Sequence, residues 1–362
     1  WRTGHFTSPV YEDVMVQLMR GIGGSGELYL LDGQTGELLW TRDYGNTPGT
    51  SPVQRGASES HMAVYDWDGD GLDEAVNYPD CPAVDKYPAK KSTVFTEELT
   101  GREITSENVT LAYNNFYEFR TDKANVWRNV ERFETRPWEV EVGGLVNNPQ
   151  TFDVDDLIRS MPLEERVYRF RCVEAWAATV PWTGFPFRAL IERVQPQSAA
   201  KYIRMTTALR PRQMVGVEEQ PWYPWPYQEG LTIEEAMNDL CLLATGVYGK
   251  PMPKQNGAPI RLITPWKYGF KQLKSITSIE FTEEQPKTLW STVTPAEYGF
   301  WANINPEVAH PRWSQATERV IPNNQRVPTR LFNGYAEWVA DMYSDLEAEY
   351  GEWLYRLSLI HI

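Results

Sequence analysis

A lone thiol with charged neighbours, Cys172 in the stretch YRFRCVEAW (168–176), is the first candidate for chemistry in this sequence. The alternation of residue types predicts a strand with Phe170 and Cys172 on one face and Arg169 and Arg171 on the other. The positive potential of the arginines favours the thiolate, which is the form that attacks carbon or binds a metal ion.

Three chemical roles are open to this thiol from its context alone. A buried, inert cysteine is the usual one. Nucleophilic catalysis needs a nearby histidine base, and the segment contains none. A metal-bound thiolate needs no base, because the cation stabilises the anion.

The other cysteines, Cys81 and Cys241, form no C-x-x-C pair with Cys172, and the histidines do not cluster, which argues against a zinc site. Cys241 lies among apolar residues and is predicted to be structural.

The composition excludes several partner classes. The chain has 362 residues and a formal net charge of −14, with 49 acidic against 35 basic side chains. Nucleic acid and anionic membranes prefer cationic surfaces, so neither is expected as a partner. With 41% hydrophobic residues the chain is globular in composition, and no apolar run approaches the roughly 18 residues of a membrane helix. The chain starts at Trp1 without a methionine, so it reads as truncated and its compartment cannot be inferred from a targeting segment.

Residues 1–90 are predicted to form β-hairpins. In GELYLLDGQTGELLW (26–40), two apolar runs, Leu28–Leu31 and Leu38–Trp40, flank turn-forming Asp-Gly and Thr-Gly pairs. This segment resembles one blade of a quinoprotein-type propeller. The preceding GIGGSG (21–26) matches a dinucleotide-binding fingerprint in its letters, but a predicted strand follows it where the fingerprint requires a helix, so a flexible turn is the better interpretation.

A second propeller-like segment, AVYDWDGDGLDEAV (63–76), resembles the FG-GAP type of calcium-binding repeat. Its acidic side chains would supply hard oxygen ligands to Ca²⁺; the alternative is a solvated acidic turn. The candidate ligands are Asp66, Asp68, Asp70 and Glu74. One or two blades cannot bury their own faces, so this region is interpreted as a fragment of a different domain or an artefact of assembly, with the junction at 78–91.

The remainder of the chain predicts an α+β fold. Strands are expected at 137–144, 201–207 and 275–282, with short helices between them. Asp153 is placed to cap one helix, and Thr232 and Glu235 have capping-box spacing at another. The predicted domain spans 91–342 and is followed by a helical tail at 343–362. The final LSLIHI resembles translated adapter sequence, and no function is assigned to it.

Several long motifs, in order, resemble one known family. They are YNNFYEFRTDKANVW (113–127), PLEERVYRFRCVEAWAATVPWTGFPF (162–187), GVYGKPMPKQNGAPIRLITPWKYGFKQLKSI (246–276), EYGFWANINPEVAHPRWSQATER (297–319) and LFNGYA (331–336). Together they are similar to the catalytic subunits of periplasmic protein-methionine-sulfoxide reductases, which are molybdenum enzymes of the sulfite oxidase superfamily. The resemblance covers about two-thirds of the chain. It implies a sulfite-oxidase-type molybdopterin-binding fold of mixed β-sheets with short helices.

The resemblance also implies which residues hold the cofactor. Cys172 would ligate molybdenum, with two further sulfurs from the dithiolene of the pterin. The other implied contacts are Asn114, Tyr117, Glu118, Thr207, Asn256, Arg261, Gln272, Leu273 and Lys274. Arg and Lys suit the phosphate of molybdopterin, and Asn, Thr and Glu suit the donors and acceptors of its ring. Gln272 departs from the small residue usual in the family, which weakens that contact unless the backbone makes it. Glu174, Trp176, Trp266, Tyr268 and Phe270 sit in the same motifs and are expected either near the metal or in the core.

The implied activity is the reduction of methionine sulfoxide residues in proteins by oxygen-atom transfer to molybdenum. The implied partners are oxidised proteins and a haem-containing membrane subunit that delivers respiratory electrons, and the implied compartment is the periplasm. Two rivals remain: a sulfite-oxidising enzyme on the same fold, which would need a cationic pocket for a small dianion, and a non-enzymatic calcium-binding fragment of a carbohydrate-acting protein.

Overall fold

The chain divides into two compact units, residues 1–77 and 78–362. The computed structural model describes residues 14–20, 26–32, 38–43 and 81–345. The division falls at the start of the junction segment 78–91 inferred from the sequence. Cys81, which the sequence grouped with the N-terminal region, contacts Arg136 and Asp155 of the second unit.

The described part of the first unit is a three-stranded antiparallel sheet, in the order β1 (Val14–Arg20), β2 (Gly26–Asp32) and β3 (Leu38–Asp43). The pairing of β2 with β3 confirms the predicted hairpin. The G-x-G-x-x-G stretch is followed by strand β2 and not by a helix, in agreement with the sequence. The proposed calcium ligands Asp66, Asp68, Asp70 and Glu74 lie outside the described residues.

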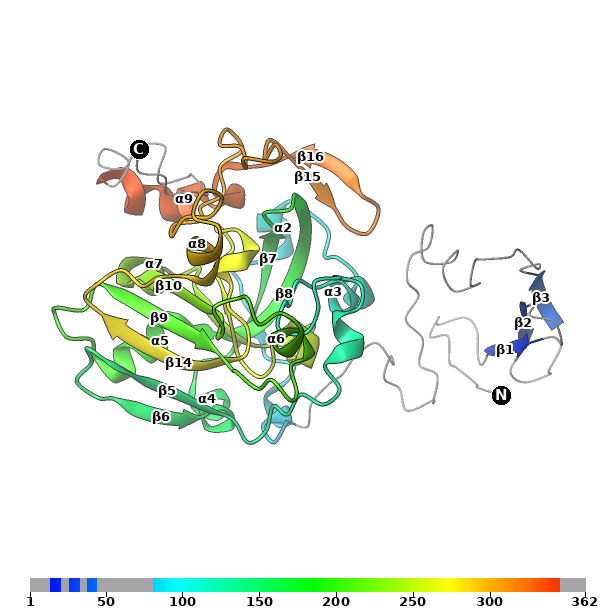
Figure 1. The fold of residues 1–362 in the computed structure, drawn as a ribbon, viewed down its shortest axis with the longest axis horizontal. Helices are drawn as coiled ribbons and strands as arrows, with labels where there is room; N and C mark the ends of the chain where they lie inside the picture. The colour runs from blue at the N-terminus through cyan, green and yellow to red at the C-terminus, as the bar shows by residue number, and fades with distance from the viewer. Residues whose placement is uncertain (1–13, 21–25, 33–37, 44–80, 346–362) are drawn as a thin grey trace. The chain divides into compact units, whose positions relative to one another are not determined.

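One sheet of the second unit has five strands (Figure 1). Its order is β10 (Gln228–Thr232), β9 (Tyr202–Thr207), β14 (Ile276–Thr282), β5 (Glu139–Gly144) and β6 (Gln150–Asp153). The β14–β5 pair is parallel and the other pairs are antiparallel. Buried and less buried residues alternate along β5 and β9, which is the period of a strand with one face on the core. Strands β5, β9 and β14 confirm the predicted ones.

The second sheet is built around the long strand β8 (Trp176–Pro186). Every residue of β8 before Pro186 is buried. Gly184 is needed there, because a Cβ would lie 2.2 Å from the carbonyl oxygen of Leu243. Strand β8 pairs with β7, β11 and β15. The remaining strands of this sheet are β4 (Lys90–Lys91), β7 (Glu164–Arg171), β11 (Leu242–Val247), β12 (Lys250–Pro251), β13 (Arg261–Ile263), β15 (Thr317–Val320) and β16 (Gln325–Pro328).

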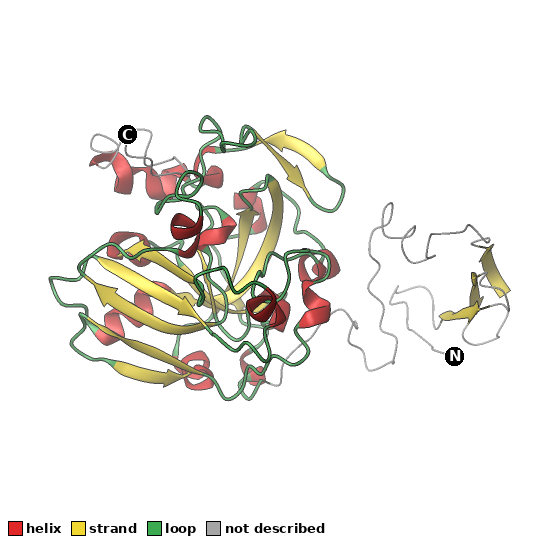
Figure 2. Ribbon diagram, in the orientation of Figure 1, coloured by secondary structure: helices red, strands yellow, loops and turns green. Residues whose placement is uncertain are grey.

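Short helices surround the strands (Figure 2). The α-helices are α2 (Glu97–Thr100), α3 (Glu107–Ala112), α4 (Val154–Ser160), α5 (Phe187–Val194), α6 (Val215–Glu219), α7 (Ile233–Met237), α8 (Leu289–Val293) and α9 (Ala336–Val339). The 3₁₀ turns are η1 (Val84–Lys86), η2 (Val126–Asn129), η3 (Lys254–Asn256), η4 (Gly269–Lys271), η5 (Leu331–Gly334) and η6 (Ala340–Tyr343). Mixed sheets with short helices confirm the predicted α+β class.

Two predicted helix caps are present. The Asp153 side chain accepts hydrogen bonds from the N–H groups of Asp155 and Asp156 at the start of α4. Thr232 and Glu235 form both hydrogen bonds of the capping box at α7.

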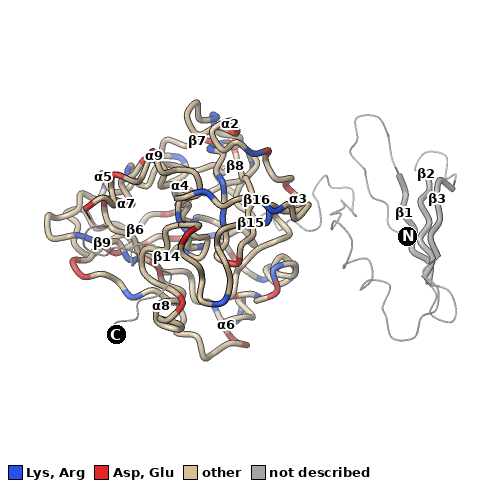
Figure 3. Tube along the Cα trace, turned by 90° about the horizontal axis from the view of Figure 1, so that it is seen from above, with Lys and Arg blue, Asp and Glu red and all other residues tan. Residues whose placement is uncertain are grey.

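Basic and acidic residues are interspersed along the trace of the second unit (Figure 3). Among the described residues, no helix has the length and apolarity that crossing a bilayer requires.

Candidate functional site

Cys172 lies at the hairpin turn between β7 and β8. Its N–H donates to the carbonyl of Trp176, and its own carbonyl accepts from the N–H of Ala175. Ala175 adopts a positive φ of 65°, which reverses the chain within this short turn. The two longest strands of the second sheet therefore fix the backbone on which the thiol is mounted.

The thiol sulfur receives two hydrogen bonds. The backbone N–H of Glu174 lies 3.4 Å from Cys172 Sγ, and the side-chain amide of Asn115 lies 3.5 Å from it. Burial raises the pKa of the Cys172 thiol to about 12, although the Glu174 N–H, Lys123 and Arg171 oppose the shift. Two donors aimed at one sulfur favour a thiolate whose charge is compensated by a cation.

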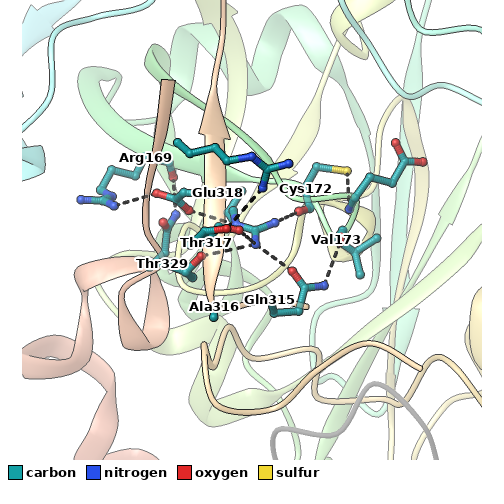
Figure 4. Close-up of polar contacts among 12 residues, drawn as sticks. Arg169, Cys172, Val173, Gln315, Ala316, Thr317, Glu318 and Thr329 are labelled. Atoms are coloured by element: carbon teal, nitrogen blue, oxygen red, sulfur yellow. Dashed lines mark hydrogen bonds and ion pairs between the residues drawn. The ribbon is translucent and has the colours of Figure 1, made fainter. Parts of the chain in front are cut away.

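Side chains from β15 and the loop before it hold the turn from behind (Figure 4). The indole N–H of Trp313 and the amide of Gln315 both donate to the carbonyl of Val173, at 2.9 and 2.8 Å. Arg171 donates to the carbonyl of Cys172 and, at 2.7 Å, to Gln315 Oε1. The carbonyl groups of Cys172 and Val173 are thus both hydrogen-bonded to a buried network.

Glu318 of β15 is the anion of this network. Its side chain is fully buried and forms ion pairs with Arg102, Arg169 and Arg171; the Arg171 Nε lies 2.9 Å from Glu318 Oε2. The predicted strand geometry is confirmed, because both β7 arginines lie on the face opposite the thiol. Arg171 does act to lower the pKa of the Cys172 thiol, as expected, but it is also paired with Glu318, and burial outweighs it. The expected preference of the unbound thiol for the thiolate form is therefore wrong.

Cys172 opens onto a pocket. The lining includes every residue that the resemblance implied for the cofactor: Asn114, Tyr117, Glu118, Cys172, Thr207, Asn256, Arg261, Gln272, Leu273 and Lys274. These residues come from segments far apart in sequence, between α3 and the loop before β14. The fold therefore brings the whole predicted set together around one cavity.

One end of the pocket is built by hydrogen bonds between the predicted residues. The amide of Asn256 donates to Asn114 Oδ1 at 3.1 Å. Arg261 Nη1 donates to the carbonyl of Asn256 at 2.7 Å, and the Thr207 hydroxyl donates to the carbonyl of Lys274 at 2.9 Å. These contacts hold the η3 turn against Asn114, which follows α3, and hold the loop before β14 against the end of β9.

Gly257 makes that close packing possible. It has a φ of +103°, and a Cβ there would lie 2.8 Å from the Cβ of Lys274. A residue with a side chain would be strained in this conformation and would push Lys274 away. At Gln272 the backbone carbonyl accepts from Arg261 at 3.5 Å, while the side-chain amide donates to Thr264. The Gln272 backbone therefore helps to hold Arg261, while its side-chain amide nitrogen is bound to Thr264.

Buried charges also point to a bound group in this pocket. Burial lowers the pKa of Arg261 to about 9 and lowers the pKa of Lys274, while burial raises the pKa of Glu118 despite the nearby Lys274. Arg261 is 3% exposed and stacks over the ring of Trp182, and no carboxylate in the described part of the chain forms an ion pair with it. A buried guanidinium of this kind is compensated by an anion such as a phosphate.

The donor set of the pocket fits molybdopterin. Several buried polar atoms of its lining have no hydrogen-bond partner among the residues that the structure describes: Asn115 Oδ1, Trp176 Nε1, Trp182 Nε1, Asn256 Oδ1, Arg261 Nε and Gln272 Oε1. Buried polar groups in folded proteins are normally satisfied, so a ligand rich in donors and acceptors is expected here. Among the described residues, no group of three or more His, Cys, Asp and Glu side chains is arranged to hold a metal ion.

The structure assigns each residue that the sequence placed either near the metal or in the core. Glu174, Trp176 and Phe270 line the pocket. Trp266 and Tyr268 are buried elsewhere; the Trp266 indole donates to Tyr343, and Tyr268 lies near Arg171. Cys241 is fully buried, as predicted, and burial raises its pKa.

Sequence reasoning missed other residues of the site. Asn115, Trp182, Trp290 and Tyr298 line the pocket, and Trp313, Gln315 and Glu318 hold its cysteine turn. Asn115 could have been found, because it follows Asn114 directly in the YNNFYEF motif. For Glu318 there was none, because its partners lie far away in the sequence.

The Cys172 turn and the adjoining pocket, whose polar lining fits molybdopterin, together indicate a class of protein. Residues 127–290 match the family described as the oxidoreductase molybdopterin binding domain. This segment includes Cys172, Thr207, Asn256, Arg261 and the 272–274 loop. The second unit is therefore a molybdopterin-binding oxidoreductase domain.

Curated relatives narrow the class to one family. The chain is 50% identical over 265 residues to the protein-methionine-sulfoxide reductase catalytic subunit MsrP of Burkholderia mallei, an alignment that covers 72% of this chain and 78% of that protein. It is 45% identical over 287 residues to the proteins of the same name from Xanthomonas axonopodis pv. citri and Xanthomonas campestris pv. campestris, covering 76% of this chain and 89% of each. The chain belongs to the family of MsrP catalytic subunits.

A solved structure is also similar in part. The sulfane dehydrogenase SoxCD from Paracoccus pantotrophus aligns with a TM-score of 0.42 at 16% identity, covering 79% of this chain and 66% of that one.

Proposed function

We propose that this chain reduces methionine sulfoxide residues in proteins to methionine at a molybdenum–molybdopterin centre held by Cys172. The observation that carries the proposal is the placement of Cys172 beside a pocket lined by all of the implied cofactor contacts. Membership in the MsrP family supports the substrate. The overall change takes up two electrons and two protons and releases a thioether and water.

A bound molybdenum–molybdopterin centre would supply the acceptor for the sulfoxide oxygen and would carry the two electrons that the reduction consumes. The chain supplies the rest. Cys172 would hold the metal, with Asn115 and the Glu174 N–H orienting its sulfur. Arg261 and Lys274 would bind the phosphate. Asn114, Thr207 and Asn256 would receive the edge of the ring, and Gln272 and Leu273 would lie along it.

The substrate side of the pocket is aromatic and lacks free charge. Tyr117, Trp290 and Tyr298 line it, and aromatic rings make favourable contacts with thioether sulfur. The nearby cations are paired: Lys123 lies 2.6 Å from Glu174, and Arg312 lies 2.7 Å from Glu297. Such an entrance favours a neutral sulfoxide over the sulfite dianion, which requires unpaired positive charge.

The setting of the reaction follows from the family resemblance and belongs to the same proposal. The chain would act in the periplasm and repair oxidised proteins there. Electrons would come from a haem-containing membrane subunit. Blue-native separation of membranes that contain this chain, followed by haem staining of the band, tests that partnership.

The test of the activity is replacement of the ligand. Cys172→Ser should abolish sulfoxide reduction with a reduced viologen as electron donor, and molybdenum measured by mass spectrometry should fall with it. Wild-type protein should reduce N-acetylmethionine sulfoxide and should not oxidise sulfite. Full activity and full molybdenum content in Cys172→Ser would overturn the assignment.

A further inference from the structure

A second cavity adjoins the pocket of Cys172. The two cavities share the lining residues Tyr117, Glu174, Trp290 and Tyr298. The second is also lined by Tyr223, Val293, Thr294, Glu297, Arg312 and Trp313. We name it the vestibule. Because its walls are shared with the catalytic pocket, a molecule that fills the vestibule reaches the surroundings of Cys172.

A row of aromatic rings leads from the catalytic pocket through the vestibule to the surface. Tyr117 packs edge-on against Trp290, with ring centroids 5.2 Å apart, and against Tyr223 at 6.2 Å. Tyr223 lies 6.2 Å from Trp222. The Trp222 side chain is 71% exposed, the largest exposed fraction recorded for a bulky hydrophobic residue among the described ones.

The loop that carries this row is fixed to the catalytic pocket. The side-chain amide of Gln220 donates to the carbonyl of Tyr117 at 3.0 Å, and the Trp225 indole donates to the carbonyl of Gln220 at 2.9 Å. Gly216, in α6, packs so closely that a Cβ would lie 2.2 Å from the Tyr117 carbonyl oxygen. The exposed position of Trp222 is therefore set by a braced loop, and an exposed indole on such a loop marks a contact surface.

We propose that the Trp222–Tyr223–Trp290 row binds the polypeptide next to the methionine sulfoxide and favours an aromatic or large aliphatic side chain near it. The inference rests on the proposed function, because the sulfoxide itself would occupy the pocket of Cys172. An extended chain advances about 3.3 Å per residue, and the two 6.2 Å steps from Tyr117 to Trp222 set an upper limit on their separation, so Trp222 would lie beside a residue at most about three or four positions away.

The charges of the vestibule support this occupant. Its acidic and basic side chains are engaged with each other, with Glu297 bound to Arg312 and Glu174 bound to Lys123. At the Trp222 end, in contrast, the ring of Tyr223 packs against other aromatic rings, and the Trp222 side chain is 71% exposed. A site with paired charges and an exposed aromatic ring selects by apolar contact and not by the charge of the substrate.

The experiment compares two peptides on the cofactor-loaded full chain. In the first, methionine sulfoxide is flanked by three glycines on each side; in the second, phenylalanine replaces the outermost glycine on one side, tested on either side. With reduced viologen as donor, the phenylalanine peptide should have the higher kcat/KM, by about three- to tenfold, chiefly through KM. Trp222→Ala should remove this preference and Trp222→Phe should keep most of it. The matched control, Val84→Ala, changes another exposed side chain that lines neither cavity and should keep the preference in full.

The outcomes separate the two proposals. If wild-type protein reduces both peptides equally well, or if Trp222→Ala keeps the preference, the row does not bind substrate and the proposed function still stands. If Trp222→Ala instead changes the sedimentation of the protein and not the preference, Trp222 is a contact between copies of this chain, and the inference is also overturned. If wild-type protein reduces neither peptide nor N-acetylmethionine sulfoxide, the proposed function itself fails.

Discussion

Replacing Glu318 by glutamine tests whether the buried network holds the cysteine turn. In the wild-type protein Glu318 faces Arg102, Arg169 and Arg171, and all of these side chains are buried or nearly so. Glutamine has the same shape but no charge. Glu318→Gln therefore leaves three guanidinium groups close together without their anion, directly behind the turn that carries Cys172.

The expected cost is large because the charges are desolvated. Removing one partner of a buried ion pair destabilises a protein by about 3–5 kcal/mol. For a unit of this size the midpoint of thermal unfolding should fall by roughly 6–10 °C. A second effect follows from the contacts of Arg171, which donates to the Cys172 carbonyl and to Gln315. When Arg171 loses Glu318 it is free to move, so the turn should hold molybdenum less well.

The assay combines thermal unfolding with molybdenum content in the same preparations. Glu283→Gln is the control, because Glu283 forms an ion pair with Lys201 at 3.3 Å in which both side chains are about 60% exposed, and a pair of that kind contributes about 0–1 kcal/mol. If Glu318→Gln unfolds within a degree of the control and keeps its molybdenum, the network does not support the site and this reasoning is wrong.

Three further predictions use the same protein. Gly257→Ala should reduce molybdopterin retention and destabilise the fold by about 1–3 kcal/mol, since it forces a side chain into a positive φ against Lys274; cofactor analysis and chemical unfolding measure both, and an unchanged cofactor content would refute the close-packing argument. In cofactor-free protein, the raised pKa of Glu118 means that this group favours folding in its protonated form, a contribution present at acid pH and lost as pH rises through about 7. Glu118→Gln should therefore become more stable relative to wild type between about pH 5 and 8, and a constant difference across that range would count against burial as the cause. Under native conditions a thiol reagent should label the partly exposed Cys81 before the fully buried Cys241, which mass spectrometry of the labelled peptides would show; the reverse order would contradict the burial pattern.

Local features of this fold could be predicted because their determinants are close in the sequence. The capping of α4 by Asp153 and the capping box of Thr232 and Glu235 involve groups two or three residues apart. The β2–β3 hairpin follows from two apolar runs around a turn. In each case the hydrogen bonds are made within one segment, so residue type and spacing are sufficient.

The residues of the candidate cofactor pocket could be named from the sequence for a different reason. No property of Asn114 or Arg261 alone distinguishes a pterin contact from an ordinary buried polar residue. Several long motifs in the right order identified the family, and the family implied their roles. The tertiary structure then placed these residues around one pocket, a convergence that no spacing rule would give.

The sequence by itself determined the family, the α+β class and the candidate thiol, since these depend on residue types in local patterns. Only the tertiary structure decided the electrostatics and support of that thiol. The alternation of β7 correctly placed Arg169 and Arg171 opposite Cys172, but their carboxylate partner lies 149 residues from Arg169 in the chain. Charge acts through space and not along the sequence, so the environment of Cys172 was fixed only when β15 paired beside β8 and carried Glu318 to the arginines.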